Sequence, residues 1–172
     1  MIARRVIFTP GMVRSTSASY LLWAPGPFPG GRHVPMTNPS PLVDVDLRRV
    51  VLASGTDHQY IYLGERNGPR LFPIMIGNAE ANEIHRVVHS GETARPLTHQ
   101  LACDLITALG AKLKAVHIVD LEENTFFARL VLVGPAGEVE VDARPSDAIA
   151  LALRLRAPIR VADAVLDAAK ET

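Results

Sequence analysis

The sequence contains one cysteine, few aromatic residues and no excess of either charge. The lone Cys103 excludes an internal disulfide framework and fits a reducing compartment. The 18 basic and 18 acidic residues cancel, which removes a global electrostatic argument for binding nucleic acid or a membrane surface. No apolar run approaches the roughly 20 residues that span a bilayer. We therefore expect a cytoplasmic protein with no membrane partner.

Acidic residues are absent from the start of the chain. All 18 lie at or after Asp44, whereas four of the 18 basic residues precede it. The same segment holds seven of the 13 prolines, too many for a helix or a central strand to persist. We predict that residues 1–41 are a disordered leader. An organellar transit peptide, a secretory signal and an over-extended start are the three interpretations; the composition changes just after Met36, which favours Met36 as the physiological first residue.

The rest of the chain, residues 42–172, has the length of a single domain. Alternating apolar residues and turn signals predict two groups of three strands, at 42–52, 58–63 and 71–76 and at 112–121, 126–133 and 138–143. Helical spacing predicts helices at 78–89, 96–109, 148–153 and 164–169, with a short strand at 159–161.

These elements predict an α+β fold. We expect a mixed, mainly antiparallel sheet of about six or seven strands, or two β-rich halves, packed against three to four helices. In the second helix, the apolar stripe of Leu101, Leu105, Ile106 and Leu109 indicates a core-facing side. The helix at 148–153 is apolar on every side and is predicted to be covered all round.

An Arg-Pro pair precedes a hydroxyl or an acid at two predicted helix starts. These are residues 95–98 (Arg-Pro-Leu-Thr) and 144–147 (Arg-Pro-Ser-Asp). The repetition suggests a diverged duplication of two halves. Helix-start chemistry alone also generates such tetrapeptides, so both explanations stay open.

Several of these segments, taken in order, resemble a known family. They are 73–77 (Pro-Ile-Met-Ile-Gly) with 80–81 (Glu-Ala), 95–99 (Arg-Pro-Leu-Thr-His), 124–128 (Asn-Thr-Phe-Phe-Ala) and 142–153 (Asp-Ala-Arg-Pro-Ser-Asp-Ala-Ile-Ala-Leu-Ala-Leu). The series resembles the bifunctional nuclease domain family over about residues 42–169. The resemblance implies an α+β domain that tends to form homo-oligomers, and a nuclease with DNA and RNA as substrates.

Phosphodiester hydrolysis needs a positioned water, neutralisation of charge on the phosphate and usually a divalent metal. Asp142 and Asp147 flank Arg144 and are the candidate catalytic carboxylates and ligands for Mg²⁺ or Mn²⁺, with Arg144 as a phosphate contact. His99 is a candidate general base or metal ligand. The candidate substrate-binding residues are Arg95, Thr98 and Ser146, at the two helix starts.

Each of these residues also has a structural explanation. Asp147, Ser146 and Thr98 suit helix capping, and both Arg-Pro pairs suit helix initiation. The folded part is net negative and its basic residues are dispersed, which weakens the nuclease interpretation. The competing hypothesis is a non-catalytic oligomeric module that binds a protein or a small anionic ligand.

Several other ionisable side chains and one thiol could serve as metal ligands or reactive groups, but we do not place them in the site. His85 and His89 lie four apart with Glu92 nearby, but Arg86 stands where a zinc protease has its glutamate, so we expect an exposed helix face. Glu80 and Glu83, on the same helix, could supply oxygens to a metal or face solvent. Cys103 is predicted to be a buried, inert thiol.

Overall fold

The computed structural model describes residues 40–91 and 93–169. Almost all of the predicted leader, as well as Glu92, lies outside these residues. No helix in the described part of the chain is long and apolar enough to cross a membrane. The described residues begin at Ser40 and Pro41, and the Pro41 carbonyl accepts a hydrogen bond from the Asp163 amide at 2.9 Å.

Within the described residues the chain forms seven strands and four helices, which confirms the α+β class. The strands are β1 (Leu42–Val51), β2 (His58–Glu65), β3 (Leu71–Gly77), β4 (Lys112–Glu122), β5 (Thr125–Gly134), β6 (Gly137–Ala143) and β7 (Ile159–Ala162). The helices are α1 (Asn78–Val88), α2 (Thr98–Ala108), α3 (Pro145–Leu155) and α4 (Asp163–Ala168). The bounds lie close to those expected from the apolar periodicity.

All seven strands belong to one sheet, with the order β3-β2-β1-β7-β4-β5-β6. The short strand β7 joins the two groups of three, since it pairs antiparallel with β1 and parallel with β4. The alternative of two β-rich halves is therefore replaced by a single mixed, mainly antiparallel sheet. Both groups are meanders followed by a helix, α1 after β3 and α3 after β6.

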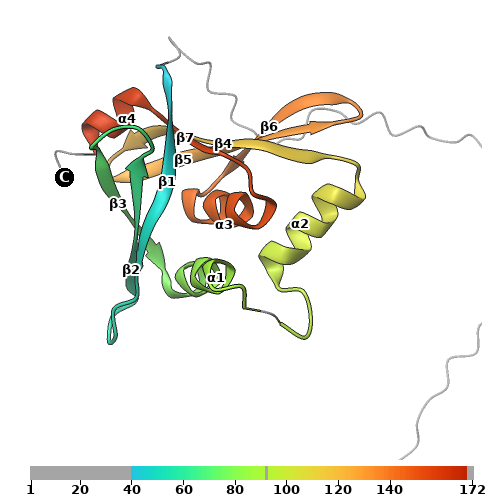
Figure 1. Ribbon diagram of the computed structural model, residues 1–172, viewed down its shortest axis with the longest axis horizontal. Coiled ribbons are helices and arrows are strands. Elements are labelled where there is room, and N and C mark those ends of the chain that lie inside the picture. The colour runs from blue at the N-terminus through green and yellow to red at the C-terminus, as the bar shows by residue number, and fades with distance from the viewer. Residues whose placement is uncertain (1–39, 92, 170–172) are drawn as a thin grey trace, which may run out of the picture. The chain divides into compact units, whose positions relative to one another are not determined.

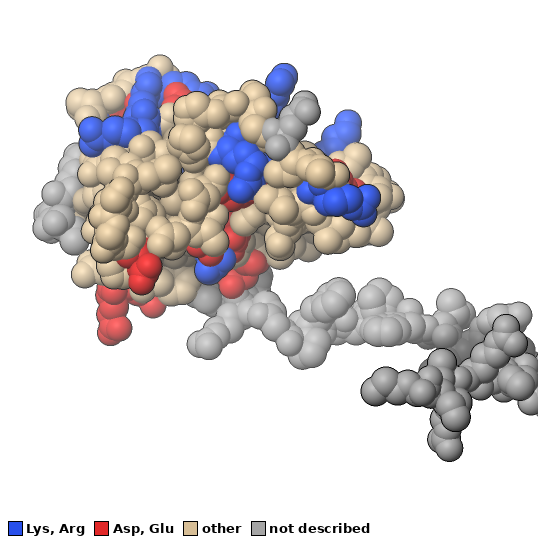
Figure 2. Space-filling view, turned by 90° about the horizontal axis from the view of Figure 1, so that it is seen from below, with Lys and Arg blue, Asp and Glu red and all other residues tan. Residues whose placement is uncertain are grey.

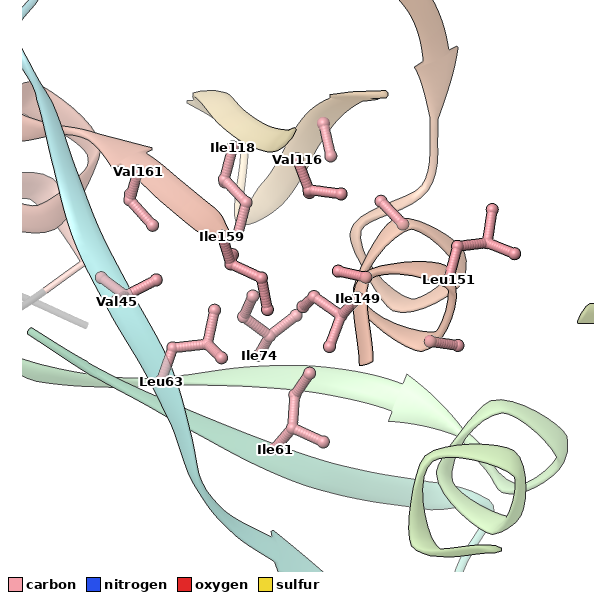
Figure 3. Packing of buried hydrophobic residues seen from close by; sticks show 14 of the residues in the cluster. Val45, Ile61, Leu63, Ile74, Val116, Ile118, Ile149, Leu151, Ile159 and Val161 are labelled. Carbon is pink, nitrogen blue, oxygen red and sulfur yellow. The ribbon is translucent and has the colours of Figure 1, made fainter. Parts of the chain in front are cut away.

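The sheet curves around α3, and α1 and α2 lie on the same side of the sheet as α3 (Figure 1). Most of α3 is buried: every residue from Pro145 to Ala152 except Asp147 is shielded from solvent. Ile149 of this helix points into a cluster with strand residues such as Ile61, Ile74 and Ile159 (Figure 3). The prediction that this helix is covered all round is confirmed.

Two expectations for α2 are wrong. The helix begins at Thr98, with Leu97 as its N-cap, so Pro96 precedes the helix instead of starting it. The leucine stripe does not face the core of this chain: Leu101, Leu105 and Leu109 are 51%, 53% and 75% exposed. The helix instead buries Cys103, beside which its smaller side chains pack.

Candidate active site at three helix starts

Four side chains from the first turns or the N-cap of three helices form one hydrogen-bonded network. Arg144 donates from Nε to Asp147 Oδ2 at 2.7 Å and from Nη2 to Glu80 Oε1 at 2.8 Å. On the other side, His99 Nε2 lies 3.0 Å from Asp147 Oδ1. We call Glu80, His99, Arg144 and Asp147 the helix-start cluster.

The sequence places each member of this cluster at the beginning of a helix. Glu80 lies in the first turn of α1, His99 is the second residue of α2, and Asp147 lies in the first turn of α3, whose N-cap is Arg144. Pro145 is the first residue of α3, where its lack of an amide hydrogen costs nothing. The positive ends of three helix dipoles therefore meet at this cluster, which favours anions there.

The charges in the cluster reinforce one another. Partial burial raises the pKa of Asp147, but the hydrogen bonds from Arg144 and His99 outweigh it, so the net pKa lies below its ordinary value. Hydrogen bonding to Asp147 in turn raises the pKa of Arg144. Asp147 is therefore an ionised carboxylate at neutral pH, and an ionised carboxylate only accepts hydrogen bonds.

This ionisation assigns the tautomer of His99. Because Asp147 accepts, His99 Nε2 carries the hydrogen, and in the neutral ring Nδ1 keeps its lone pair. The side chain of His99 is 18% exposed and that of Arg144 is 66% exposed. The cluster thus offers solvent a basic nitrogen beside a guanidinium.

The other sequence-predicted site residues lie outside this network. Asp142 lies on β6, in register with Arg129 of β5, and is exposed. Arg95 and Thr98 are exposed at the start of α2, whereas Ser146 is buried at 7% exposure. The structure therefore joins His99, Arg144 and Asp147 and leaves the other four residues out of the hydrogen-bonded cluster.

Sequence reasoning considered Glu80 but did not include it in the site. The available signal was its position in the first turn after a glycine, which is where α1 begins. Glu83, one turn later, was expected to face solvent or a metal and does neither. It is 4% exposed and pairs with Arg154 of α3 and with Arg86.

The described residues do not present a divalent metal site. No group of three or more His, Cys, Asp or Glu side chains in residues 40–91 and 93–169 is arranged to hold a metal. Arg144 occupies the space between the carboxylates of Glu80 and Asp147, where a cation would lie. His85 and His89 stack with their ring centroids 4.0 Å apart on an exposed helix face, and Glu92 lies outside the described residues.

A polar cleft of about 370 Å³ lies elsewhere, between α1, α2 and the end of α3. Its lining includes Arg86, Arg154, Arg156, Asp104 and Cys103. Burial raises the pKa of the Cys103 thiol, which agrees with the prediction of a buried, unreactive side chain.

Comparison with known proteins places this arrangement in a family. Residues 61–172 match the bifunctional nuclease domain. The chain belongs to the bifunctional nuclease domain family. All four members of the helix-start cluster lie within the matched residues. The family resemblance expected from the ordered motifs is confirmed.

Relatives occur in bacteria and plants. Rv1829, an uncharacterized protein of Mycobacterium tuberculosis strain H37Rv, is 50% identical over 106 residues, 62% of this chain and 63% of that protein. Bifunctional nuclease 1 of Arabidopsis thaliana is 32% identical over 108 residues, 60% of this chain and 33% of that protein. Bifunctional nuclease 2 of rice is 27% identical over 134 residues, 76% of this chain and 36% of that protein. The chain thus spans less than two thirds of each of these relatives.

Positive and negative side chains are interspersed on the surface of the domain. Figure 2 shows Lys and Arg in several separate groups on one face, with acidic side chains near some of them. Many cations of the described residues pair with a nearby carboxylate, as Arg66 Nη2 does with Asp46 Oδ1 at 2.8 Å and Lys114 Nζ does with Glu138 Oε2 at 2.6 Å. Any nucleic-acid contact therefore depends on particular residues.

Proposed function

We propose that the protein hydrolyses phosphodiester bonds of DNA and RNA at the helix-start cluster. The proposal is carried by one observation: a histidine oriented by an ionised aspartate lies beside an exposed arginine, where three helix starts meet. Family membership supports a nuclease, and two of the plant relatives carry that activity in their names.

Each member of the cluster has a distinct role in this reaction. His99 Nδ1 accepts a proton from the water that attacks phosphorus, and Asp147 holds the ring and stabilises the imidazolium that forms. The ester P–O bond opposite the attacking water breaks, the leaving oxygen takes a proton from solvent, and His99 then returns its proton to solvent. Arg144 contacts a non-bridging phosphate oxygen through Nη1, whose two N–H groups are in no hydrogen bond with the described residues. Glu80 fixes the plane of the guanidinium from the opposite side.

A dependence on Mg²⁺ or Mn²⁺ stays a separate prediction. It would require Arg144 to leave the space between Glu80 and Asp147, and Asp142 to join them. We derive no step of the reaction through a metal. Adding EDTA to the assay therefore tests the metal independently of the cluster.

The deciding experiment compares the full chain with His99→Ala and Asp147→Asn on single-stranded DNA and RNA, each with Mg²⁺, Mn²⁺ or EDTA. Asp163→Asn is the matched control, since Asp163 is also a first-turn acid bound to an arginine, Arg70 at 2.7 Å. We expect cleavage to fall about 100-fold or more in the two cluster variants. The control should retain wild-type activity.

Two results would overturn this assignment. Equal cleavage by wild type and His99→Ala, both folded, would place the activity at another site or in a contaminant. Absence of cleavage by the wild type under every condition would favour a binding module. Loss of activity in Asp142→Asn together with loss in EDTA would instead support the metal hypothesis.

We also propose that the protein is a homo-oligomer that associates through α2. Leu97, Leu101, Leu105 and Leu109 recur every four residues on one side of this helix and are 40%, 51%, 53% and 75% exposed. Neighbouring leucines at this spacing share one helix face. A contiguous row of four exposed leucines is the kind of apolar patch that marks a protein–protein contact.

Sedimentation of Leu101→Arg and Leu105→Arg tests this proposal. A charge on the stripe should convert the oligomer to a monomer that still folds, because both leucines are already exposed in the isolated chain. Leu71→Arg is the control, because Leu71 is 50% exposed at a distant strand. A monomeric wild type would contradict the proposal.

A non-catalytic anion-binding module is the second candidate function. The observation that favours it is the cleft between α1, α2 and the end of α3, whose lining includes Arg86, Arg154 and Arg156. Arg154 and Arg86 already pair with Glu83, which leaves Arg156 as the exposed cation of the cleft. Protection of the wild type, but not of Arg156→Gln, by phosphate in thermal melts would support this alternative.

A further inference from the structure

The face of β1, β2 and β3 that points away from α1 and α3 carries the exposed ring of Tyr60 and, next to it, Tyr62 with Arg49 over its ring. Cross-strand register sets Val51, Tyr60 and Met75 in one row and Arg49, Tyr62 and Pro73 in the next. Residues directly opposite in adjacent strands point to the same face. We call these six residues the outer β1–β3 face.

The alternate positions of the same strands are buried, which fixes the direction of the outer face. Ile61 and Ile74 are 0% and 4% exposed and belong to the core. Tyr60 and Met75, next to them in sequence, are 38% and 57% exposed. The Tyr60 ring is therefore available to a ligand instead of filling the core, whereas Tyr62 is half-buried and has Arg49 over its ring.

Arg49 and Arg48 give this face its positive charge. The guanidinium carbon of Arg49 lies 4.4 Å from the centroid of the Tyr62 ring, and Arg49 forms no ion pair with the described residues. One row further along, the side chain of Arg48 covers Gly64: a Cβ on that glycine would lie 2.7 Å from Arg48 Cγ. Asp46 Oδ2 lies 4.0 Å from Arg48 Nη2, but the closer ion pair of Asp46 is with Arg66, whose Nη2 lies 2.8 Å from Asp46 Oδ1.

The outer face leads to the helix-start cluster. Gly77 ends β3 two residues after Met75, so a Cβ there would point to the same face as Met75. That Cβ would lie 2.6 Å from Glu80 Oε2, which means that the Glu80 carboxylate covers Gly77 on this side. Glu80 also binds Arg144, so its carboxylate connects the Gly77 end of the outer β1–β3 face with the proposed catalytic residues.

We propose that the outer β1–β3 face binds single-stranded nucleic acid and guides it to the helix-start cluster. A base stacks on the exposed Tyr60 ring only when it is not stacked and paired in a duplex, so this surface selects single strands. Arg48 and Arg49 contact phosphates, as cations do along single-strand binding grooves. The proposal rests on the nuclease function proposed above and adds a substrate form to it.

Part of this surface lies outside the family match. The match begins at residue 61, after Arg48, Arg49 and Tyr60. Those three residues therefore come from a part of this chain that the family profile does not cover.

Binding is measured separately from cleavage, by fluorescence anisotropy of a labelled oligothymidylate in EDTA with the full chain carrying His99→Ala. Tyr60→Thr removes a ring and keeps a residue that favours strands, whereas Tyr60→Phe keeps the ring. Phe127→Thr is the matched control, since Phe127 is 39% exposed on β5 of the same sheet, against 38% for Tyr60.

We expect Tyr60→Thr to weaken binding about tenfold, with Tyr60→Phe and Phe127→Thr close to the parent protein. Arg49→Gln should weaken binding and lower the slope of its salt dependence by about one. A duplex of the same length should bind more weakly than the single strand. These results would support the outer face as a single-strand platform.

Three results would overturn the proposal. Equal losses in Tyr60→Thr and Phe127→Thr, or tighter binding of the duplex, would remove the single-strand platform. A change in sedimentation of Tyr60→Thr without a change in affinity would assign the face to a second copy of the chain. A different result separates the two proposals: if the wild-type protein cleaves nothing but Tyr60→Thr and Arg49→Gln still weaken binding, the outer face is supported and only the nuclease function is rejected.

Discussion

Two groups of acids and arginines join the same three helices and differ in exposure. In the helix-start cluster, Glu80 of α1 and Asp147 of α3 hold Arg144, whose side chain is 66% exposed. About one turn further along α1, Glu83 pairs with Arg154, and these side chains are only 5% and 16% exposed. Arg154 Nη1 also donates to Gln100 of α2 at 2.5 Å, as His99 of α2 binds Asp147 in the first group.

This difference in exposure separates a structural role from a chemical one. In the second group the buried Glu83 accepts from Arg154 and from the partly exposed Arg86, and Arg154 also donates to Gln100, so the group holds α1, α2 and α3 together. The exposed group uses similar side chains at helix starts, where hydrogen-bond donors and a basic nitrogen still face solvent. Ion pairs alone thus do not identify a site; accessible donors that remain after pairing do.

The largest effect is expected from the buried group. Glu83→Ala leaves Arg154 and Arg86 without their carboxylate and should lower the free energy of unfolding by about 3 kcal/mol. Glu80→Ala should cost about 1 kcal/mol, because its partner Arg144 is 66% exposed and stays solvated when the carboxylate is removed. Urea denaturation of both variants measures the contrast. Equal losses would erase the distinction between the two groups.

A paired arginine replacement is expected to separate stability from activity. Arg144→Lys keeps the charge but loses the two-nitrogen contact, so cleavage should fall about tenfold or more while the melting temperature changes little. Arg154→Lys should lower the melting temperature and leave the activity of the folded protein unchanged. Cleavage rates and thermal melts of the two variants give the answer. The reverse pattern would exchange the roles of the two groups.

A smaller effect is expected from a histidine outside both groups. The Nε2 atom of His117 on β4 is buried without a hydrogen-bond partner among the described residues. Burial, reinforced by the charge of Arg160, lowers the pKa of His117 below its ordinary 6.5. The neutral His117 ring therefore makes its full contribution to the free energy of unfolding above pH 6.5. This contribution is lost as the pH falls through the lower pKa that His117 has in the folded state.

The pH dependence of unfolding checks this histidine. Stability should decrease from pH 7 to pH 5, and His117→Gln should flatten that decrease. The charged groups that act on His117 are Arg160, Glu140, Glu138 and Lys114, and they stay in place in the variant. An unchanged slope in His117→Gln would assign the decrease to another group.

The smallest effect is expected from acid titration of the exposed group. The net lowering of the Asp147 pKa means that its carboxylate stabilises the fold fully above its ordinary 3.8 and loses this effect as the pH falls through its lower folded-state value. Asp147→Asn should remove that part of the acid dependence. Unfolding curves between about pH 4 and pH 2 measure it. A steeper loss of stability with falling pH in Asp147→Asn than in the wild type would contradict a lowered pKa for Asp147.

Much of the fold could be predicted because its signals are local. Apolar alternation marked β1 and β2, and Pro145 with Asp147 marked the start of α3. The exposed side of α2 could not be predicted in the same way. Its leucines have the spacing of a core stripe, and periodicity records that a helix has an apolar face without recording what covers that face.

The site was predicted in part for the same reason. Arg144 and Asp147 are three residues apart, and one helix start brings them together. His99 reaches Asp147 across 48 positions, and Glu80 reaches Arg144 across 64. Such pairs form only after three helices have packed on one curved sheet. Asp142 was grouped with Asp147 by proximity in sequence, but β6 ends between them and the chain turns into α3.

The sequence by itself determined the class of fold, the positions of the strands and helices and the family to which the chain belongs. These follow from periodicity and turn chemistry, which act over a few residues. Only the tertiary structure decided that β7 joins both groups of strands into one sheet and that Glu83 is buried while Glu80 remains partly exposed. Pairing across long sequence separations depends on how the whole core packs, and no local pattern encodes it.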